Sequence, residues 1–172
     1  MNFLYKNLRE NQLSGVEVFP LGLARECGLG HIYGYGAIAS FVPGWGRARE
    51  AQSSLVSLTT LDTVAAGRFQ DKKLLIKMDV EGFELEVLAG AAHTLDLSPK
   101  PTWLVEIFLS NEAIPGGVNR KFSETFEAFW KHGYRSRMLD SARSSVGQTD
   151  VTRWVANGFV DSGTPNFLFS AD

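Results

Sequence analysis

The chain has 172 residues, 44% of them hydrophobic and 21% charged, a composition typical of one globular domain with a sizeable core. The 17 Lys and Arg residues against 19 Asp and Glu residues give a formal net charge of -2, so no broad basic surface exists for nucleic acid. A single cysteine, Cys27, excludes an internal disulfide, and the three histidines lie too far apart for zinc spacing. We therefore treat residues 1–172 as a single domain in a reducing compartment, with no nucleic-acid partner and no bound metal.

The amino-terminal residues MNFLYKNLRENQ mix charged side chains into every turn and lack the apolar core that a signal peptide requires. No window approaches the roughly 18 to 20 uninterrupted apolar residues that span a bilayer. We therefore expect a soluble, cytoplasmic protein that does not insert into a membrane.

The first half of the chain alternates between helical and extended patterns. Phe3, Leu4 and Leu8 fall on one side of an amphipathic helix, and Pro20 makes the next strand irregular because proline removes a ladder donor. The expected elements are a helix over 2–12, a strand over 16–23, a glycine-rich loop with at most one hairpin over 26–46, a strand over 54–58, and a helix over 61–66 capped by Thr59 or Thr60.

The second half continues the alternation. The expected elements are strands over 74–78, 103–108, 134–139 and 166–169, a helix from 83 to about 95, and a helix over 122–132 that Gly133 ends, whereas the polar residues 141–158 predict no element. Alternating strands and helices favour an α/β domain, with a largely parallel sheet covered by helices. In such sheets ligands bind at the carboxyl ends of the strands.

Several acids follow one of these strands in the stretch LLIKMDVEGFELEVLAG. Glu81, Glu84 and Glu86 fall in or just before the first helical turn, where the helix dipole favours negative charge, and this structural role explains Glu84 and Glu86. Asp79 comes directly after the strand, so its side chain would face the crevice at the sheet edge. A structural and a functional role both stay open for Asp79.

Glu106 lies inside WLVEIF, a run otherwise suited to burial on both faces. An unpaired carboxylate there would carry a large desolvation cost, so Glu106 needs a partner. That partner is either Lys77 on the neighbouring strand, in a structural ion pair, or a ligand at the strand end.

The glycine-rich stretch GLGHIYGYG invites interpretation as a nucleotide loop. A phosphate-binding loop opens onto the amino end of a helix, but the residues that follow, AIASFVP, are not helical. We therefore do not assign a phosphate site here.

The segment IKMDVEGFELEVLAGA resembles the signature of the FkbM-type methyltransferases, an Ile-Lys-Ile-Asp-Val-Glu-Gly core followed by a helix. Further segments resemble the family in matching order: NFLYKNLRENQLSGVEVFPLGLARECG, YGYGAIASFVPG, SLTTLDTV, WLVEIF and TPNFLFSAD. The resemblance covers almost everything except roughly residues 140–163.

This resemblance implies a Rossmann-like class I methyltransferase sheet, mostly parallel with an antiparallel last strand. It implies transfer of a methyl group from S-adenosylmethionine to a hydroxyl of a sugar, polyketide or similar small-molecule acceptor. Carried over to this sequence, the catalytic candidates are Asp79, Glu81 and Glu106, with Asp79 or Glu81 as the base or as an orienting group. The cofactor-binding candidates are Leu23, Ala24, Asp79 and Val80, and Ser40 is the candidate on the acceptor side.

The sequence departs from the family at its amino terminus. Family members begin with a strand carrying an Asp-x-Gly-Ala-x-x-Gly loop, followed by a helix and a strand ending in Phe-Glu-Pro, and neither motif occurs here. We therefore expect an incomplete sheet that lacks its first two strands. Three explanations stay open: a fragment or misplaced start, a chain that folds alone with 16–23 moved beside 74–78, or a homo-oligomer or partner chain that completes the sheet.

Two other functions stay open beside the methyltransferase. One is a truncated, catalytically inactive module that binds a metabolite or a protein. The other is a divalent-metal site formed by Asp79, Glu81 and Glu106.

Overall fold

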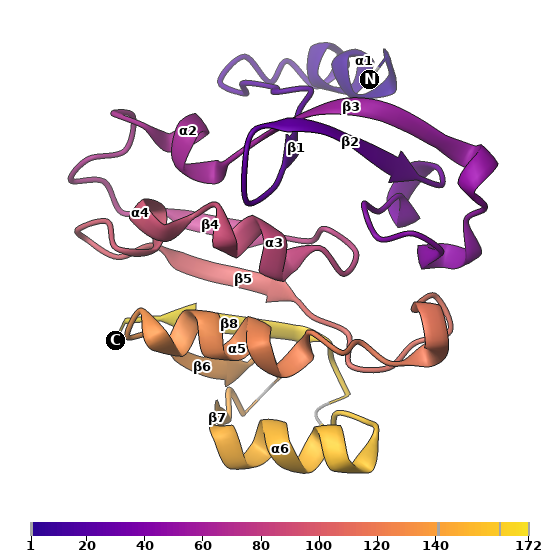
Figure 1. Ribbon diagram of the computed structural model, residues 1–172. Helices are drawn as coiled ribbons and strands as arrows, with labels where there is room; N and C mark the ends of the chain where they lie inside the picture. Colours follow the sequence, from indigo (N-terminus) through magenta and orange to yellow (C-terminus); the bar gives the residue numbers. More distant parts are fainter. Residues whose placement is uncertain (1, 141, 162, 172) are drawn as a thin grey trace.

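The computed structural model describes residues 2–140, 142–161 and 163–171, and it contains two β-sheets with helices packed beside them (Figure 1). The strands are β1 (Gly22–Leu23), β2 (Gly28–Tyr33), β3 (Ser53–Thr59), β4 (Leu75–Met78), β5 (Thr102–Glu106), β6 (Arg135–Met138), β7 (Ser145–Val146) and β8 (Asn166–Ser170). The helices are α1 (Asn2–Glu10), α2 (Leu61–Ala65), α3 (Glu84–Ala89), α4 (Ala92–Leu95), α5 (Phe122–Lys131) and α6 (Gln148–Asn157). Short 3-10 turns are η1 (Gly36–Ile38), η2 (Trp45–Arg47), η3 (Glu50–Gln52) and η4 (Pro115–Gly117).

The larger sheet has the strand order β4-β5-β8-β6-β7. β4 and β5 run parallel, whereas β8 is antiparallel to both β5 and β6, and β7 is antiparallel to β6. In Figure 1, α3 and α5 lie across the front of this sheet and α6 lies at its lower edge beside β7. Because β4 and β5 are parallel neighbours, their carboxyl ends meet at one edge.

An aromatic core fills the space between the larger sheet and α5. Buried and partly exposed residues alternate along β5 and β8, so one face of each strand is enclosed. Phe129 of α5 stacks on Phe169 with ring centroids 3.9 Å apart, and Phe126 packs edge-on against Phe167. Each fully buried ring contributes about 1.5–3 kcal/mol, which makes this part of the molecule the stable frame of the site.

The smaller sheet has the order β1-β3-β2, with β1 parallel and β2 antiparallel to β3. Gly22 leaves room for Phe41 and Leu58, and Gly30 leaves room for Leu58, because a Cβ atom at either position would overlap these side chains. This packing explains why two strands of the sheet carry glycines.

Two contacts join the smaller sheet to the helices of the larger one. The carbonyl of Ala24, just beyond β1, lies so close to Gly90 that a Cβ atom at Gly90 would overlap it. Asp62 of α2 accepts hydrogen bonds from the backbone N–H groups of His93 (3.0 Å) and Thr94 (2.8 Å) and thereby caps α4.

The prediction of one mostly parallel sheet is wrong. The strands form two mixed sheets, and the described pairs are parallel only at β1–β3 and β4–β5. The predicted strand over 16–23 shrinks to two residues and pairs with β3, so it is not moved beside 74–78 either. The physical reason is β2, which adds to the other edge of β3 and builds a separate sheet. Among the described residues, β4 has β5 as its one strand neighbour and its outer edge is unpaired.

Most individual elements are confirmed within a few residues, including α1, β3, β4, β5, α5, β6 and β8. The hydroxyl cap is also confirmed, since Thr60 accepts a hydrogen bond from the Thr63 N–H group at 3.0 Å. Three differences remain. The glycine-rich loop contains β2, the helix expected from 83 to 95 is interrupted at Gly90, and residues 145–157 form β7 and α6.

Candidate functional site

The candidate site begins where β4 ends. Asp79 follows β4 directly, and a turn through Val80, Glu81 and Gly82 leads into α3. Glu81 and Gly82 both have left-handed backbone conformations, with φ of 52° and 88°. Glycine is required at position 82 for a second reason, because a Cβ atom there would overlap the indole of Trp45.

Asp79 and Glu106 lie on either side of one lysine. The Lys77 Nζ atom lies 3.3 Å from Oδ2 of Asp79 and 3.7 Å from Oε2 of Glu106. Of the two partners left open for Glu106, the structure shows the ion pair with Lys77, and Asp79 shares it. Burial raises the pKa of Glu106 above its ordinary value, and the neighbouring Asp79 carboxylate raises it further. Two carboxylates that share one cation leave excess negative charge at the edge where β4 and β5 end.

Glu81 holds a loop against this edge. Its Oε2 atom accepts a hydrogen bond from Nε1 of the buried Trp45 at 2.7 Å. Its backbone carbonyl accepts one from the Ser40 hydroxyl at 2.6 Å, and that hydroxyl in turn accepts one from the Val42 N–H group. Ser40, the acceptor-side candidate, is thus brought to the site, but its hydroxyl is engaged in fixing the loop.

The burial of Glu84, to which the sequence analysis gave only a structural role at the helix start, is a feature of this site that it did not predict. The residue is 3% exposed, and its Oε1 atom accepts a hydrogen bond from the Gly82 N–H group at 3.0 Å. Burial raises the pKa of Glu84 to about 7, against the lowering effect of backbone hydrogen bonds. A signal was available in the sequence, since Glu84, Val87, Leu88 and Ala91 have the spacing of one buried helical stripe.

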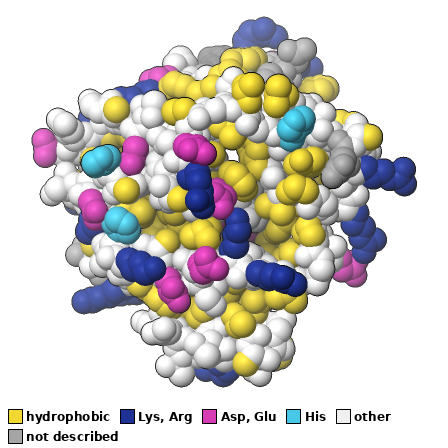
Figure 2. All heavy atoms as spheres, viewed as in Figure 1, with side chains coloured by type: hydrophobic (Ala, Val, Ile, Leu, Met, Phe, Trp, Pro, Cys, Tyr) yellow, Lys and Arg dark blue, Asp and Glu magenta, His cyan; other side chains and the backbone are white. Residues whose placement is uncertain are grey.

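Glu86 links three separate segments. It accepts hydrogen bonds from Arg25 Nε at 2.6 Å and from Lys121 Nζ at 2.7 Å. Arg25 follows β1 and Lys121 precedes α5, so this carboxylate ties the smaller sheet to the helices of the larger one. Figure 2 shows acidic and basic side chains interspersed across the middle of this face of the molecule.

Of the remaining cofactor candidates, Val80 follows Asp79 directly, whereas Leu23 and Ala24 belong to the smaller sheet. Leu23 ends β1 in the smaller sheet, and Ala24 is buried against Gly90. Leu23 and Val80 are partly buried and pack against the large core. The structure therefore brings Asp79 together with Glu106 and Ser40 together with Glu81, whereas Leu23 and Ala24 belong to the other sheet.

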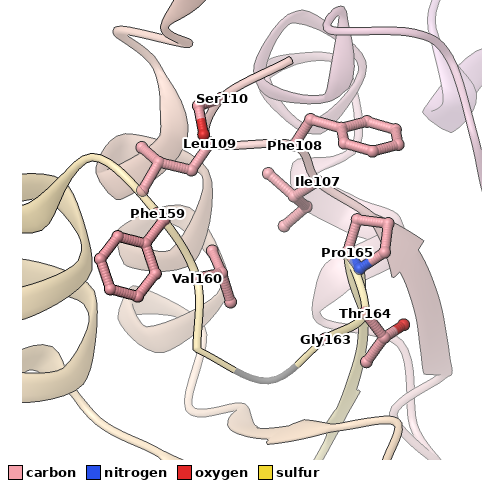
Figure 3. A pocket seen from close by; sticks show the side chains of 9 residues that line it. All are labelled: Ile107, Phe108, Leu109, Ser110, Phe159, Val160, Gly163, Thr164 and Pro165. Atoms are coloured by element: carbon pink, nitrogen blue, oxygen red, sulfur yellow. The ribbon is translucent and has the colours of Figure 1, made fainter.

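Two cavities of about 200 Å³ lie beyond the ends of β4 and β5. The first lies between the segment after β5 and the segment before β8, where residues 107–110 face residues 159–160 and 163–165 (Figure 3). Its lining is mainly apolar, with Phe159 and Leu109 labelled on one side of Figure 3 and Pro165 on the other. The second cavity lies beside the Glu81–Gly82 turn and includes Trp45 and Gly82 in its lining.

Neither a metal-binding group of side chains nor a membrane-spanning helix is present in the described ranges. Within residues 2–140, 142–161 and 163–171, no three His, Cys, Asp or Glu side chains are grouped so as to hold a metal ion, so the alternative of a metal at Asp79, Glu81 and Glu106 gains no support. No helix in these ranges is long and apolar enough to cross a membrane.

Residues 11–136 match the methyltransferase FkbM domain, which covers β1 to β5, α5 and the start of β6. The chain belongs to this family. It is accordingly an S-adenosylmethionine-dependent methyltransferase, and the use of that donor follows from membership of the family. Comparison with curated proteins found no match, and neither did comparison with solved structures.

Proposed function

We propose that the protein transfers a methyl group from S-adenosylmethionine to a hydroxyl oxygen of a small metabolite, such as a sugar or a polyketide. The observation that carries this proposal is the pair of carboxylates, Asp79 and Glu106, at the adjoining carboxyl ends of β4 and β5 with Lys77 between them. Ligands of open α/β sheets bind at such ends.

The charge of this pair fits the donor. S-adenosylmethionine supplies an electrophilic methyl group on a positively charged sulfur, and it also carries an ammonium group. Two carboxylates against one lysine favour binding of a further positive charge. In this proposal Asp79 and Val80 hold the methionine end of the donor, and Leu23 with Ala24 lie towards the adenine, an assignment that rests on the family resemblance.

The two carboxylates take different roles. The hydroxyl oxygen of the acceptor attacks the methyl carbon while its proton passes to a nearby carboxylate. Glu106 is the better base of the pair because its pKa is raised, which increases its affinity for a proton. Asp79 orients the donor. Glu81 accepts a hydrogen bond from Trp45 and another from Ser40, so it positions the loop around Ser40 instead of acting as the base.

A binding module without turnover is the second candidate. It is favoured by the outer edge of β4, which has no strand partner among the described residues, and by the location of Leu23 and Ala24 in a different sheet from Asp79.

We propose that a further strand, from another segment or a second chain, pairs with the outer edge of β4 when the donor site is complete. Unpaired strand edges readily accept such a partner.

Calorimetric titration with S-adenosylhomocysteine tests the first candidate against the second. We expect a binding heat that Asp79→Ala abolishes. The variant removes the exposed carboxylate that is proposed to hold the methionine end of the donor. The matched control is Glu124→Ala, an exposed carboxylate on α5, which should leave the heat unchanged. No heat from the folded protein would favour the binding module.

The base is tested separately. Glu106→Gln should still give a binding heat, weaker because one of the two carboxylates is lost, and should lower methyl transfer from labelled S-adenosylmethionine to hydroxylated metabolites at saturating donor by about 10²–10⁴-fold, the usual contribution of a general base. A Glu106→Gln variant with undiminished transfer would remove Glu106 from this role.

A further inference from the structure

The cavity beside the Glu81–Gly82 turn combines an apolar lining with basic residues at one end. The loop around Trp45 forms one wall and residues 114–121 form the other. The apolar lining residues are Val42, Trp45, Ile114, Pro115 and Val118, and the polar ones are Asn119, Arg120 and Lys121. A volume of about 200 Å³ is below the roughly 300–1,000 Å³ of complete ligand sites, so this cavity suits one end of a small molecule.

The walls of this cavity are fixed by hydrogen bonds before any ligand binds. Trp45 is held by Glu81, and the Gly46 N–H group donates to the Ala113 carbonyl at 2.8 Å, which joins the two walls. The Asn119 side chain donates to the Phe108 carbonyl and accepts from the Lys121 N–H group at 2.9 Å. A preformed cavity loses little conformational entropy when a ligand enters.

The charge at the basic end is not balanced. Arg120 is exposed and forms no ion pair or hydrogen bond within the described part of the chain. Lys121 shares the single carboxylate of Glu86 with Arg25, so these two cations face one anion. Two acids on the segments that form the walls are engaged elsewhere, since Glu112 pairs with Arg47 at 2.9 Å and Glu81 binds Trp45.

We propose that this cavity binds an anionic end of the methyl acceptor, a carboxylate or phosphate carried on an apolar, ring-sized body. The apolar body would contact Val42 and Ile114, and the anion would be held by Arg120, whose guanidinium suits both groups. This inference rests on the proposed methyl transfer, and it adds that the acceptor is negatively charged. The cavity adjoins the turn that begins at Asp79, so the acceptor occupies the same edge of the sheet as the donor.

The indole N–H signals of the tryptophans provide a test that needs no turnover. The chain has four tryptophans, and Trp45→Phe assigns the signal of Trp45 in a nitrogen-15 correlation spectrum. Titration with 4-hydroxybenzoate should shift the Trp45 signal, and phenyl phosphate tests whether phosphate serves as well as carboxylate. The neutral analogue 4-hydroxybenzamide should bind about tenfold more weakly. Equal binding of the amide, or shifts confined to the other indoles, would overturn the proposal.

Variants of Arg120 give the second arm. Arg120→Gln should weaken 4-hydroxybenzoate binding about tenfold and Arg120→Lys should restore most of it, because the lysine keeps the charge. Arg135→Gln, an exposed cation at the start of β6 and hence at the opposite end of the sheet, is the matched control and should have no effect. Unchanged binding in Arg120→Gln would refute the site.

The two proposals fail in different ways. If S-adenosylhomocysteine binds but neither anion does, only the acceptor inference is lost. If the anions bind at Arg120 while S-adenosylhomocysteine gives no heat, the cavity stands as an anion site and the methyl-transfer proposal falls.

Discussion

Glu84 and Glu106 show how two carboxylates near one strand end acquire different properties. Glu84 is enclosed at the start of α3 with one hydrogen bond from a backbone N–H group. Glu106 is partly exposed and has Lys77 beside it. Burial raises the pKa of both, but only Glu106 faces the edge where the acceptor is proposed to bind. Glu84 therefore affects the stability of the turn, and Glu106 is the candidate for chemistry.

Stability should depend on pH through Glu84. Its pKa rises from 4.5 to about 7 on folding, so between these values the folded state binds more protons than the unfolded state and the free energy of unfolding falls as pH rises. At about 1.4 kcal/mol per pKa unit, the rise from 4.5 to about 7 corresponds to about 3 kcal/mol of stability that is present at low pH and lost as pH rises through 7. Urea unfolding at pH 5 and pH 7.5 measures it.

Glu84→Gln is the variant that isolates this effect. The amide stays neutral and still accepts the Gly82 hydrogen bond, so the variant should lose much of the decline in stability between pH 5 and 7.5. Glu124→Gln, on the exposed face of α5, should keep the wild-type pH dependence. If the two variants show the same pH dependence as wild type, Glu84 is not the group responsible.

At the scale of secondary-structure elements, the joint between the two sheets depends on a close backbone approach. Gly90 separates α3 from α4, and its carbonyl accepts a hydrogen bond from the Asp62 N–H group at 3.0 Å. The carbonyl of Ala24 occupies the space where a side chain at position 90 would begin. One glycine therefore allows β1, α2 and α3 to meet.

Gly90→Ala should destabilise the protein by about 1–3 kcal/mol, because the added methyl group meets backbone that cannot rotate away. Gly28→Ala is the matched control, since a Cβ atom there meets nothing within 4 Å and Gly28 lies on exposed β2. The free energies of unfolding in urea give the comparison. Equal stabilities of the two variants would mean that the joint is less tight than the structure has it.

Helices and strands whose residue spacing is visible in a short stretch of sequence were predictable. Elements that depend on contacts with residues far away in the sequence were not. α5 follows from the spacing of Phe122, Phe126 and Phe129, all fully buried. The sequence allowed a hairpin within 26–46 but did not place β2, because Gly28 and Gly30 lower strand propensity and the reason for Gly30 is Leu58 on another strand.

The same distinction holds for the site. The place of Asp79 at a strand end was predicted, and the Lys77–Glu106 pair was one of two alternatives for Glu106, because strand ends and a charge in an apolar run are visible in short windows. The hydrogen bond from Trp45 to Glu81 joins residues 36 positions apart, and no local pattern indicates it. The roles of Glu81 and Ser40 in fixing a loop therefore required the structure.

At the scale of the whole molecule, apolar residues are unevenly enclosed. Of the 16 large hydrophobic side chains that are exposed among the described residues, 12 lie between Phe3 and Leu75. The buried residues of the main core cluster all lie between Met78 and Phe169. Figure 1 shows the corresponding arrangement, with α1 and the smaller sheet above the larger sheet and its helices. The smaller sheet is consequently held by few buried contacts of its own.

Native-state hydrogen exchange should reveal this difference as two levels of protection. Amides of β5, β8 and α5 should exchange only through global unfolding, because they surround the aromatic core. Amides shared by β2 and β3 should exchange faster by more than roughly tenfold, since local opening of the smaller sheet exposes little apolar surface. Gly90→Ala should widen the gap further by loosening the joint at Ala24, whereas Gly28→Ala should leave the protection of β5 and β8 unchanged. Equal protection of the two sheets in the wild-type protein would show that they unfold as one cooperative unit. The smaller sheet would then be held more firmly than its exposed apolar residues indicate.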